Sequence, residues 1–456
     1  MFKLGLYSTA AEVLLYFGSS GGEGPCFRIA ELKKKDGCIE MTLIEFIDDV
    51  PIDNMVSCLS IKPEKVVFVG DKKPMKKQED VYLRLTEKYN IQVVFEYVAI
   101  NKNSVEQIVE TLADIVENEE DCVFDLTGGD DLVLVAMGIV YERYREKKNI
   151  QMHRFNIRTG TIHDCDSDGV LPELAPLKLT VKDNIMIYGG DIVSFNGSKG
   201  TYDWNFDDEF ELDVRVMWDI CKNNPGLWNT QIGTFAYISR FCSKDPFQLD
   251  MSANKQHIKE FMENDEKKYA WDSMLIRDFQ RYGLIKNFSD DDDYTSFEFK
   301  NKQVKLCLTK EGTLLELMVL IFAKAAKDKD GAPKYNDIVN GAYIDWDSTI
   351  HDITDEEKDT ENEIDVILMR GLVPIFISCK NGYVDENELY KLNSVAEKFG
   401  GPYVQKVLIA TYFGKSTEEG HKYFVQRAKD MKIQLIENVH DMSDDEFAKA
   451  IKNILC

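Results

Sequence analysis

The chain has no run of about 18 consecutive apolar residues, so a membrane-spanning helix is not expected. Its ten cysteines form no CxxC pair, and neither they nor the six histidines show the spacing of a Cys/His metal site. Cysteines scattered in this way are typical of a reducing cytosol and not of a disulfide-stapled secreted domain. The sequence therefore predicts a soluble, cytoplasmic protein.

The N-terminus has no clear targeting signal. Met1–Gly18 is mildly apolar, but Glu12 interrupts it and no small-residue cleavage site follows. We expect it to belong to an N-terminal extension, residues 1–40, and not to be a signal peptide.

Basic residues are in deficit, with 55 Lys and Arg against 80 Asp and Glu and a net charge of −25. Generic adhesion to nucleic acid is not expected, because phosphate binding requires clustered Lys and Arg. An enzyme that acts on nucleic acid would need a local basic groove and metal ions. Much of the acid gathers in Asp290–Asp293 and Asp352–Glu363, which we interpret as solvated loops.

At 456 residues the chain is long enough for two or three domains with substantial cores. Residues 41–166 alternate strand and helix, which predicts an α/β domain with a mainly parallel, Rossmann-like sheet covered on both faces. Ligands of such folds lie beyond the carboxyl ends of the strands. The predicted strands are Met41–Ile47, Lys65–Val69, Ile91–Val98 and Cys122–Leu126, and the predicted helices are Pro51–Leu59, Gln78–Tyr89, Ser104–Glu117 and Asp131–Arg145.

Residues 167–304 are predicted to be a helical connector or insertion, with a winged helix as the alternative. The predicted helices are Leu179–Tyr188, Leu212–Lys222 and Phe261–Gln280, with Pro225, Trp228 and Pro246 in the loops between them. The five tryptophans are expected in cores or interfaces and not as base-stacking platforms.

Residues 305–456 are predicted to form a mixed α/β domain. A helix over Lys310–Lys327 is expected to start after Thr309 as its N-cap. The remaining predicted strands are Asn336–Asp345, Glu363–Leu368, Pro374–Lys380, Val407–Tyr412 and Ile433–Ile436, and the remaining helices are Glu386–Phe399, Glu418–Met431 and Ser443–Leu455.

A candidate phosphate site follows the strand Cys122–Leu126, where Thr127-Gly128-Gly129 leads into a helix. Two glycines let the backbone approach a ligand closely, and the helix N-terminus offers free N–H groups to an anion. The turn lies at the carboxyl edge of the predicted sheet, beside the turn Asp48–Ile52. The alternative is that the glycines form only a tight connection.

A second candidate site combines two carboxylates and a lysine within apolar elements. Asp365 and Lys380 lie on neighbouring antiparallel strands, and Glu316 interrupts an apolar helix. Charges among buried elements are costly unless they are paired or bind a metal, so this set predicts a hydrated divalent cation beside a phosphate. The alternatives are a buried salt bridge for Asp365 and Lys380 and a solvent-facing Glu316.

The strand-TGG-helix element in 41–165, together with the acid–acid–lysine half in 305–456, resembles CRISPR-associated ancillary nucleases. These join an N-terminal CARF domain to a PD-(D/E)xK restriction-endonuclease-like domain. The resemblance implies a homodimer that binds a cyclic oligoadenylate, here cyclic tetra-adenylate, across its interface. The ligand would contact residues of both turns and a lysine after the second strand, namely Thr127, Gly128, Gly129, Asp130, Asp49, Val50, Pro51, Ile52 and Lys72 or Lys73. Asp130 and Asp131 depart from the family pattern, which has Thr or Ser and then Lys.

In the second site, the resemblance implies that Asp365, Glu316, Ser378 and Lys380 are catalytic. Asp365, Glu316 and the Cys379 carbonyl would hold Mg²⁺ or Mn²⁺, and Lys380 would orient the attacking water. Ser378 departs from the family pattern, which has an acid there. Glu388 is expected beside the site.

The implied function is a metal-dependent endonuclease of type III CRISPR antiviral defence, activated allosterically by the ring. Single-stranded DNA or RNA and duplex DNA are all open as substrates, and sequence does not choose among them. Two alternatives remain: a CARF transcription regulator with an inert C-terminal domain, and a restriction-type endonuclease whose N-terminal domain is only a dimerisation scaffold.

Overall fold

The structure is a computed structural model that describes most of the chain. The described residues are 34–35, 38–167, 169–171, 174–193, 204–243, 245, 248–347, 349, 361–382, 384–412 and 418–454. For 34–35, 38–40 and 72–77 the description covers the backbone only. The predictions for residues 1–33, for Pro246 and for the acidic segment 352–360 fall outside this part. Within it, no helix combines the length and apolar character that a membrane crossing requires.

Sheet A is an eight-stranded sheet in the order β4-β3-β2-β5-β6-β7-β8, with β1 beside β2. All neighbours from β4 to β6 are parallel, which confirms the predicted α/β fold. The parallel strand β6 and the antiparallel strands β7 and β8 were not predicted. The strands are β1 (Lys34–Lys35), β2 (Cys38–Phe46), β3 (Pro63–Gly70), β4 (Val94–Ala99), β5 (Asp121–Asp125), β6 (Asn149–Asn156), β7 (Thr161–Asp164) and β8 (Gly169–Val170).

Four helices cover sheet A. They are α1 (Val56–Ile61), α2 (Lys72–Lys88), α3 (Val105–Asn118) and α4 (Asp131–Tyr144). Helices α3 and α4 pack on one face through residues such as Leu112 and Met137, and α1 and α2 contribute Leu59 and Tyr82 to a separate cluster. Ser104, the first residue of the helix predicted over Ser104–Glu117, is the N-cap of α3, because its hydroxyl accepts a hydrogen bond from the Gln107 amide at 3.3 Å.

The middle of the chain contains more regular structure than predicted. Helix α5 (Val181–Ile187) and strand β9 (Asp191–Ile192) lead from sheet A to a second, six-stranded sheet. Sheet C, three-stranded in the order β10-β12-β11, then forms with its own helices. Its elements are α6 (Asp208–Asn223), α7 (Pro225–Cys242), β10 (Asp250–Asn254), α8 (Lys255–Asn264), α9 (Ser273–Arg281), β11 (Ile285–Asp290), β12 (Tyr294–Phe299) and α10 (Lys302–Cys307).

Two predictions in this region were wrong. Pro225 and Trp228 lie in helix α7 and not in a loop, since Asn224 caps the helix and Pro225 occupies its first turn, where its missing N–H costs nothing. The single helix predicted over 261–280 is two helices, because Asp272 caps a new helix by accepting hydrogen bonds from two amides. Trp218 and Trp228 are buried, as expected for core residues.

Sheet B has six strands in the order β17-β16-β15-β14-β13-β9. Its remaining elements are α11 (Thr313–Ala325), β13 (Asp337–Asp345), β14 (Glu361–Arg370), β15 (Val373–Lys380), α12 (Glu386–Gly400), η1 (Gly401–Tyr403), β16 (Gln405–Ala410), α13 (Glu418–Asp430), β17 (Ile433–Ile436) and α14 (Asp444–Lys452). The predicted N-cap Thr309 was wrong: α11 starts after Gly312, and the Thr309 hydroxyl donates to the Lys305 carbonyl instead.

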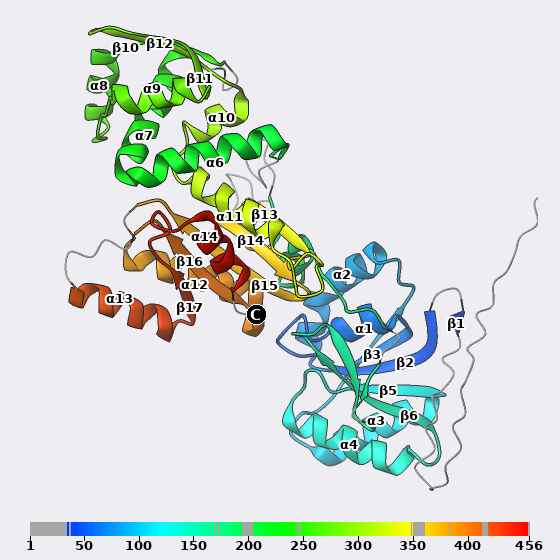
Figure 1. The fold of residues 1–456 in the computed structure, drawn as a ribbon. Helices are drawn as coiled ribbons and strands as arrows, with labels where there is room; N and C mark the ends of the chain where they lie inside the picture. Colours follow the sequence, from blue (N-terminus) through cyan, green and yellow to red (C-terminus); the bar gives the residue numbers. More distant parts are fainter. Residues whose placement is uncertain are drawn as a thin grey trace, which may run out of the picture.

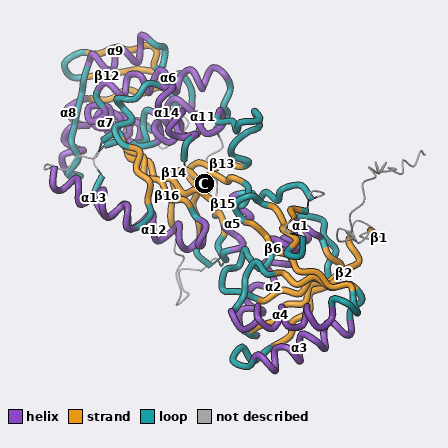
Figure 2. The backbone as a smooth tube through the Cα atoms, turned by 60° about the horizontal axis from the view of Figure 1, so that its bottom comes forward, coloured by secondary structure: helices purple, strands orange, loops and turns teal. Residues whose placement is uncertain are grey.

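Sheet B lies between the other two sheets, with sheet A at one end of the molecule and sheet C at the other (Figures 1 and 2). Helix α5 packs on α2 of the first part and on α12 of the second. One apolar cluster therefore runs from Leu59 and Tyr82 beside sheet A to Ile344 and Phe399 at sheet B. The two halves share a core and do not hang on a linker.

Candidate functional site

The ladder between β14 and β15 opens at one end of sheet B. Paired residues end at Val366 and Ile377, while β15 stays paired with β16 as far as Lys380. Beyond the last pair, the Asp365 side chain, and not the backbone of β14, accepts the hydrogen bonds of β15. Its Oδ2 accepts hydrogen bonds from the Cys379 amide at 2.6 Å and the Ser378 hydroxyl at 3.2 Å. This opening places a carboxylate at the end of the neighbouring strand.

Lys380 completes an ion-pair network there. Its Nζ lies 3.5 Å from Asp365 Oδ2 and 3.2 Å from Glu388 Oε2. Burial lowers the pKa of Lys380, but the two carboxylates outweigh it and the pKa is raised. The Lys380 side chain is 32% exposed and that of Asp365 16%. The lysine is therefore charged and open to solvent, unlike a sealed salt bridge.

Glu316 joins the site from helix α11 and does not face solvent, being 6% exposed. Its Oε2 accepts from Asn340 Nδ2 at 3.0 Å, and the same nitrogen donates to the Asp365 carbonyl at 2.9 Å. Burial and the charge of Asp365 raise the pKa of Glu316 to about 8. Asn340, from β13, thus connects the two acids, and nothing in the sequence pattern indicated it.

These residues fit a hydrated Mg²⁺ or Mn²⁺. Within the described part of the chain, Asp365 Oδ1 and Glu316 Oε1 accept no hydrogen bond, and no three His, Cys, Asp or Glu side chains form a metal-binding group. Burial raises the pKa of Asp365 also, so a cation would relieve the cost of both charges. Two carboxylates suffice for Mg²⁺, which keeps several waters and binds substrate phosphates.

Cys379 remains a predicted ligand only through its carbonyl. Burial holds the pKa of its thiol well above the usual value, so the thiol stays protonated. The N–H and C=O of one strand residue point to the same side, and its N–H faces Asp365. We therefore expect the carbonyl on that side.

The insertion contacts the strand end that carries Lys380. Asn381 Nδ2 donates to Asn229 Oδ1 at 2.8 Å, and Asn229 donates back to the Asn381 carbonyl. Gly382 follows at φ 137°, and a Cβ there would lie 3.2 Å from Asn229 Nδ2. Helix α7 therefore holds the loop after Lys380, a role that no local pattern in the sequence indicates.

Replacing Asn229 with Ala is expected to lower the kcat of the cleavage predicted from the sequence by about tenfold, because the loop after Lys380 loses both hydrogen bonds. Steady-state cleavage kinetics measure this, and KM should change little. Asn223→Ala, in the exposed C-terminal turn of α6, is the matched control. An unchanged kcat would mean that the contact has no positioning role.

The predicted ligand turn packs against the turn after β2. The Gly129 amide donates to Asp48 Oδ2 at 2.9 Å, and a Cβ on Gly128 would lie 3.3 Å from Asp48 and Asp53. The structure thus brings the glycine turn against Asp48 and Asp53, which flank the predicted segment Asp49–Ile52, while Ile52 itself is buried in the core. Two groups of the turn that could donate to a ligand are already engaged within the protein. The Gly129 amide donates to Asp48, and the Thr127 hydroxyl donates to Asp125. Asp130 caps helix α4, and the side chain of Lys72 lies outside the described part.

This site is acidic. Burial, together with the charges of Asp48 and Asp125, raises the pKa of Asp53 to about 7, although a hydrogen bond from Tyr403 lowers it. Burial raises the pKa of Asp125 to about 6, and raises that of Glu45 well above the usual value. Tyr403 lies in the other half of the molecule, with its hydroxyl 3.4 Å from Asp53 Oδ2. Asp53 thus connects the ligand turn to sheet B.

Asp53→Asn is expected to raise the unfolding free energy above that of wild type, and to raise it more at pH 8 than at pH 5. Between about pH 4 and 7 the folded state holds a proton that the unfolded state lacks, so the unfolding free energy of wild type falls as pH rises. Allowing for solvent screening, we expect the variant to be more stable than wild type by about 2 kcal/mol at pH 8. Melting temperatures across this range test it. Asp49→Asn, at an exposed position, should show no such trend.

No family model matches the chain, and no curated protein matches its sequence. Solved structures do match its fold. Protein VC1899 from Vibrio cholerae is 18% identical, with a TM-score of 0.63, over 90% of this chain and 96% of that one. Can2 from Sulfobacillus thermosulfidooxidans, solved with cyclic tetra-adenylate, is 15% identical, with a TM-score of 0.59, over 90% and 97%. At these identities the likeness shows a shared fold over nearly the whole chain.

Proposed function

We propose that this protein is a cyclic oligoadenylate-activated, metal-dependent nuclease of type III CRISPR defence. The observation that carries the proposal is the meeting of Asp365, Glu316 and Lys380 at an open end of sheet B. The fold shared with Can2, which was solved with cyclic tetra-adenylate, supports the same ligand here.

In the proposed reaction Asp365 and Glu316 would hold the metal, since one oxygen of each carboxylate accepts no hydrogen bond from a described residue. Bound Mg²⁺ or Mn²⁺ supplies Lewis-acid polarisation of the phosphoryl group and a water of lowered pKa. Lys380 offsets negative charge that develops on the phosphoryl oxygens. Ser378, which stands where the family has an acid, donates its hydroxyl to Asp365 and fixes that carboxylate.

The proposed activator site is the acidic crevice between the turns at 127–131 and 48–53. Ring phosphates would meet the N-terminus of α4, while protonation of Asp53 and Asp125 would reduce the repulsion. Helix α4 also exposes Leu132 (37%) and Val135 (54%) directly after this turn. These exposed apolar side chains support a homodimer that meets here.

Signal transfer would run through Asp53, which touches both the Gly128 turn and Tyr403. Tyr403 precedes β16, and β16 pairs with the strand that carries Lys380. A ring that binds one arrangement of these turns better than the other would shift the nuclease half with it.

The test is cleavage of labelled single-stranded and duplex DNA and RNA with Mn²⁺ and each ring size in turn. The proposal expects ring-dependent cleavage that is lost in Asp365→Asn. Cleavage without any ring would favour the alternative of a restriction-type endonuclease whose N-terminal domain is only a dimerisation scaffold. No cleavage under any condition, with intact duplex binding, would favour the transcription regulator.

A further inference from the structure

The elements around sheet C follow one another as helix, strand, two helices and two strands: α7-β10-α8-α9-β11-β12. The sheet order β10-β12-β11 places the first strand beside the last (Figure 1). This is the connectivity of a winged helix-turn-helix. In DNA-binding helix-turn-helix proteins the second helix of the pair, here α9, enters the major groove.

Helix α9 buries one face and exposes the other. Ile276 and Phe279 are fully buried in the core of this part of the molecule. The opposite face exposes Met274, Arg277, Gln280 and Arg281, spaced at helical intervals. Neither arginine forms an ion pair with any described residue, and Arg281 lies 5.7 Å from the Tyr282 ring.

Charge near α9 runs against the acidity of the whole chain. Segment 267–286 holds five basic residues (Lys267, Lys268, Arg277, Arg281 and Lys286) and two acidic ones (Asp272 and Asp278), so 5 − 2 gives +3, against −25 for the chain. The exposed acids Glu263, Asp265 and Glu266 directly precede this segment. Lys267 and Lys268 are exposed beside the helix. Asp272 accepts from the first amides of α9, so its carboxylate is engaged as a cap.

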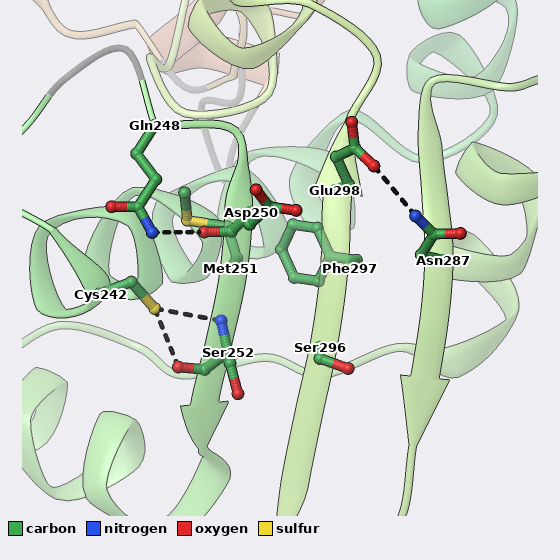
Figure 3. A pocket seen from close by; sticks show the side chains of 9 residues that line it. All are labelled: Cys242, Gln248, Asp250, Met251, Ser252, Asn287, Ser296, Phe297 and Glu298. Atoms are coloured by element: carbon green, nitrogen blue, oxygen red, sulfur yellow. Dashed lines mark hydrogen bonds between the residues drawn. The ribbon is translucent and has the colours of Figure 1, made fainter.

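The outer face of sheet C has the opposite charge. Met251 and Phe297 point into the core, so their strand neighbours Asp250 and Glu298 point outward. These acids line a shallow pocket of about 370 Å³ (Figure 3). The tip between β11 and β12 adds Asp290–Asp293. Of these two faces, the side of α9 is the more favourable one for a polyanion.

We propose that the exposed face of α9 binds duplex DNA in the major groove through Arg277, Gln280 and Arg281. Arg pairs with guanine and Gln with adenine at this groove edge. The deep, narrow major groove of duplex RNA would exclude the helix. The acidic tip would weaken the binding by repelling the backbone. The inference is independent of the cleavage chemistry proposed above.

The test is fluorescence anisotropy of full-length protein with a labelled DNA duplex of about two helical turns, in EDTA and without any ring, over a salt series. Arg277→Ala/Arg281→Ala should bind at least about tenfold more weakly and lower the salt slope by about 2. Arg84→Ala/Arg143→Ala removes equal charge from exposed positions on α2 and α4, and should change affinity less than about twofold.

A second variant changes the sign of the effect. Asp292→Asn/Asp293→Asn removes two exposed acids from the tip and should strengthen duplex binding. The proposal is overturned if wild type binds no duplex DNA at low salt, if the control pair loses as much affinity as the α9 pair, or if duplex RNA binds equally well. Because no metal or ring is present, a failed nuclease assay leaves this result unaffected.

Discussion

Lys380→Ala is expected to reduce the kcat of ring-activated cleavage by roughly 10²–10³-fold, one of the largest effects among the single changes considered. The lysine is the group that offsets charge on the phosphoryl oxygens, and its Nζ lies within 3.5 Å of Asp365. No other lysine or arginine of the described chain pairs with that carboxylate. Single-turnover cleavage with saturating Mn²⁺ measures the loss.

The matched control is Lys422→Ala. Lys422 lies in the same half, is 72% exposed and, among the described residues, pairs only with Glu418, four residues before it. It should retain near wild-type cleavage. Ring binding by Lys380→Ala should also persist, since its loss would indicate misfolding. Full cleavage by a folded Lys380→Ala protein would remove Lys380 from the mechanism.

Gly129→Ala is expected to weaken ring binding by about tenfold or more, and to raise the ring concentration needed for cleavage by the same factor. Gly129 has φ 143°, and a Cβ there would lie 2.9 Å from Leu134 Cδ2. The turn must shift, and the hydrogen bond from the Gly129 amide to Asp48 would be lost. Calorimetric titration with cyclic tetra-adenylate measures the change.

Gly138→Ala, on helix α4 that follows the turn, serves as the control, because a Cβ at Gly138 meets nothing within 4 Å. It should bind the ring as wild type does. Equal affinity of the Gly129→Ala protein for the ring would place the ligand elsewhere and would contradict the proposed activator site.

The sequence pattern carried most of the secondary structure of sheets A and B. Ser104 and Ser443, at the predicted starts of two helices, cap those helices, because a cap depends on a hydrogen bond between residues three apart. The sequence pattern failed at α7, because it predicted a loop between helices at Pro225. Proline ends a helix in its interior but favours one at its first position, and only the Asn224 cap distinguishes the two cases.

Some residues of the two candidate sites could be predicted from local geometry, and others could not. A short connection makes β14 and β15 antiparallel neighbours, so the meeting of Asp365 and Lys380 followed from local geometry. Asn340, Asn229 and Tyr403 could not be predicted, since each reaches its partner from a distant segment.

Local periodicity and capping chemistry in the chain alone thus specified an α/β protein with a glycine turn at a sheet edge and an acid–lysine strand pair. Tertiary packing decided that helix α7 is hydrogen-bonded to the loop after Lys380 and that the surroundings of the glycine turn are acidic. It also decided that Asp53 contacts both halves of the molecule. These features depend on which distant side chains share a small volume, and burial there sets their pKa values and partners. Sequence spacing carries no record of that proximity.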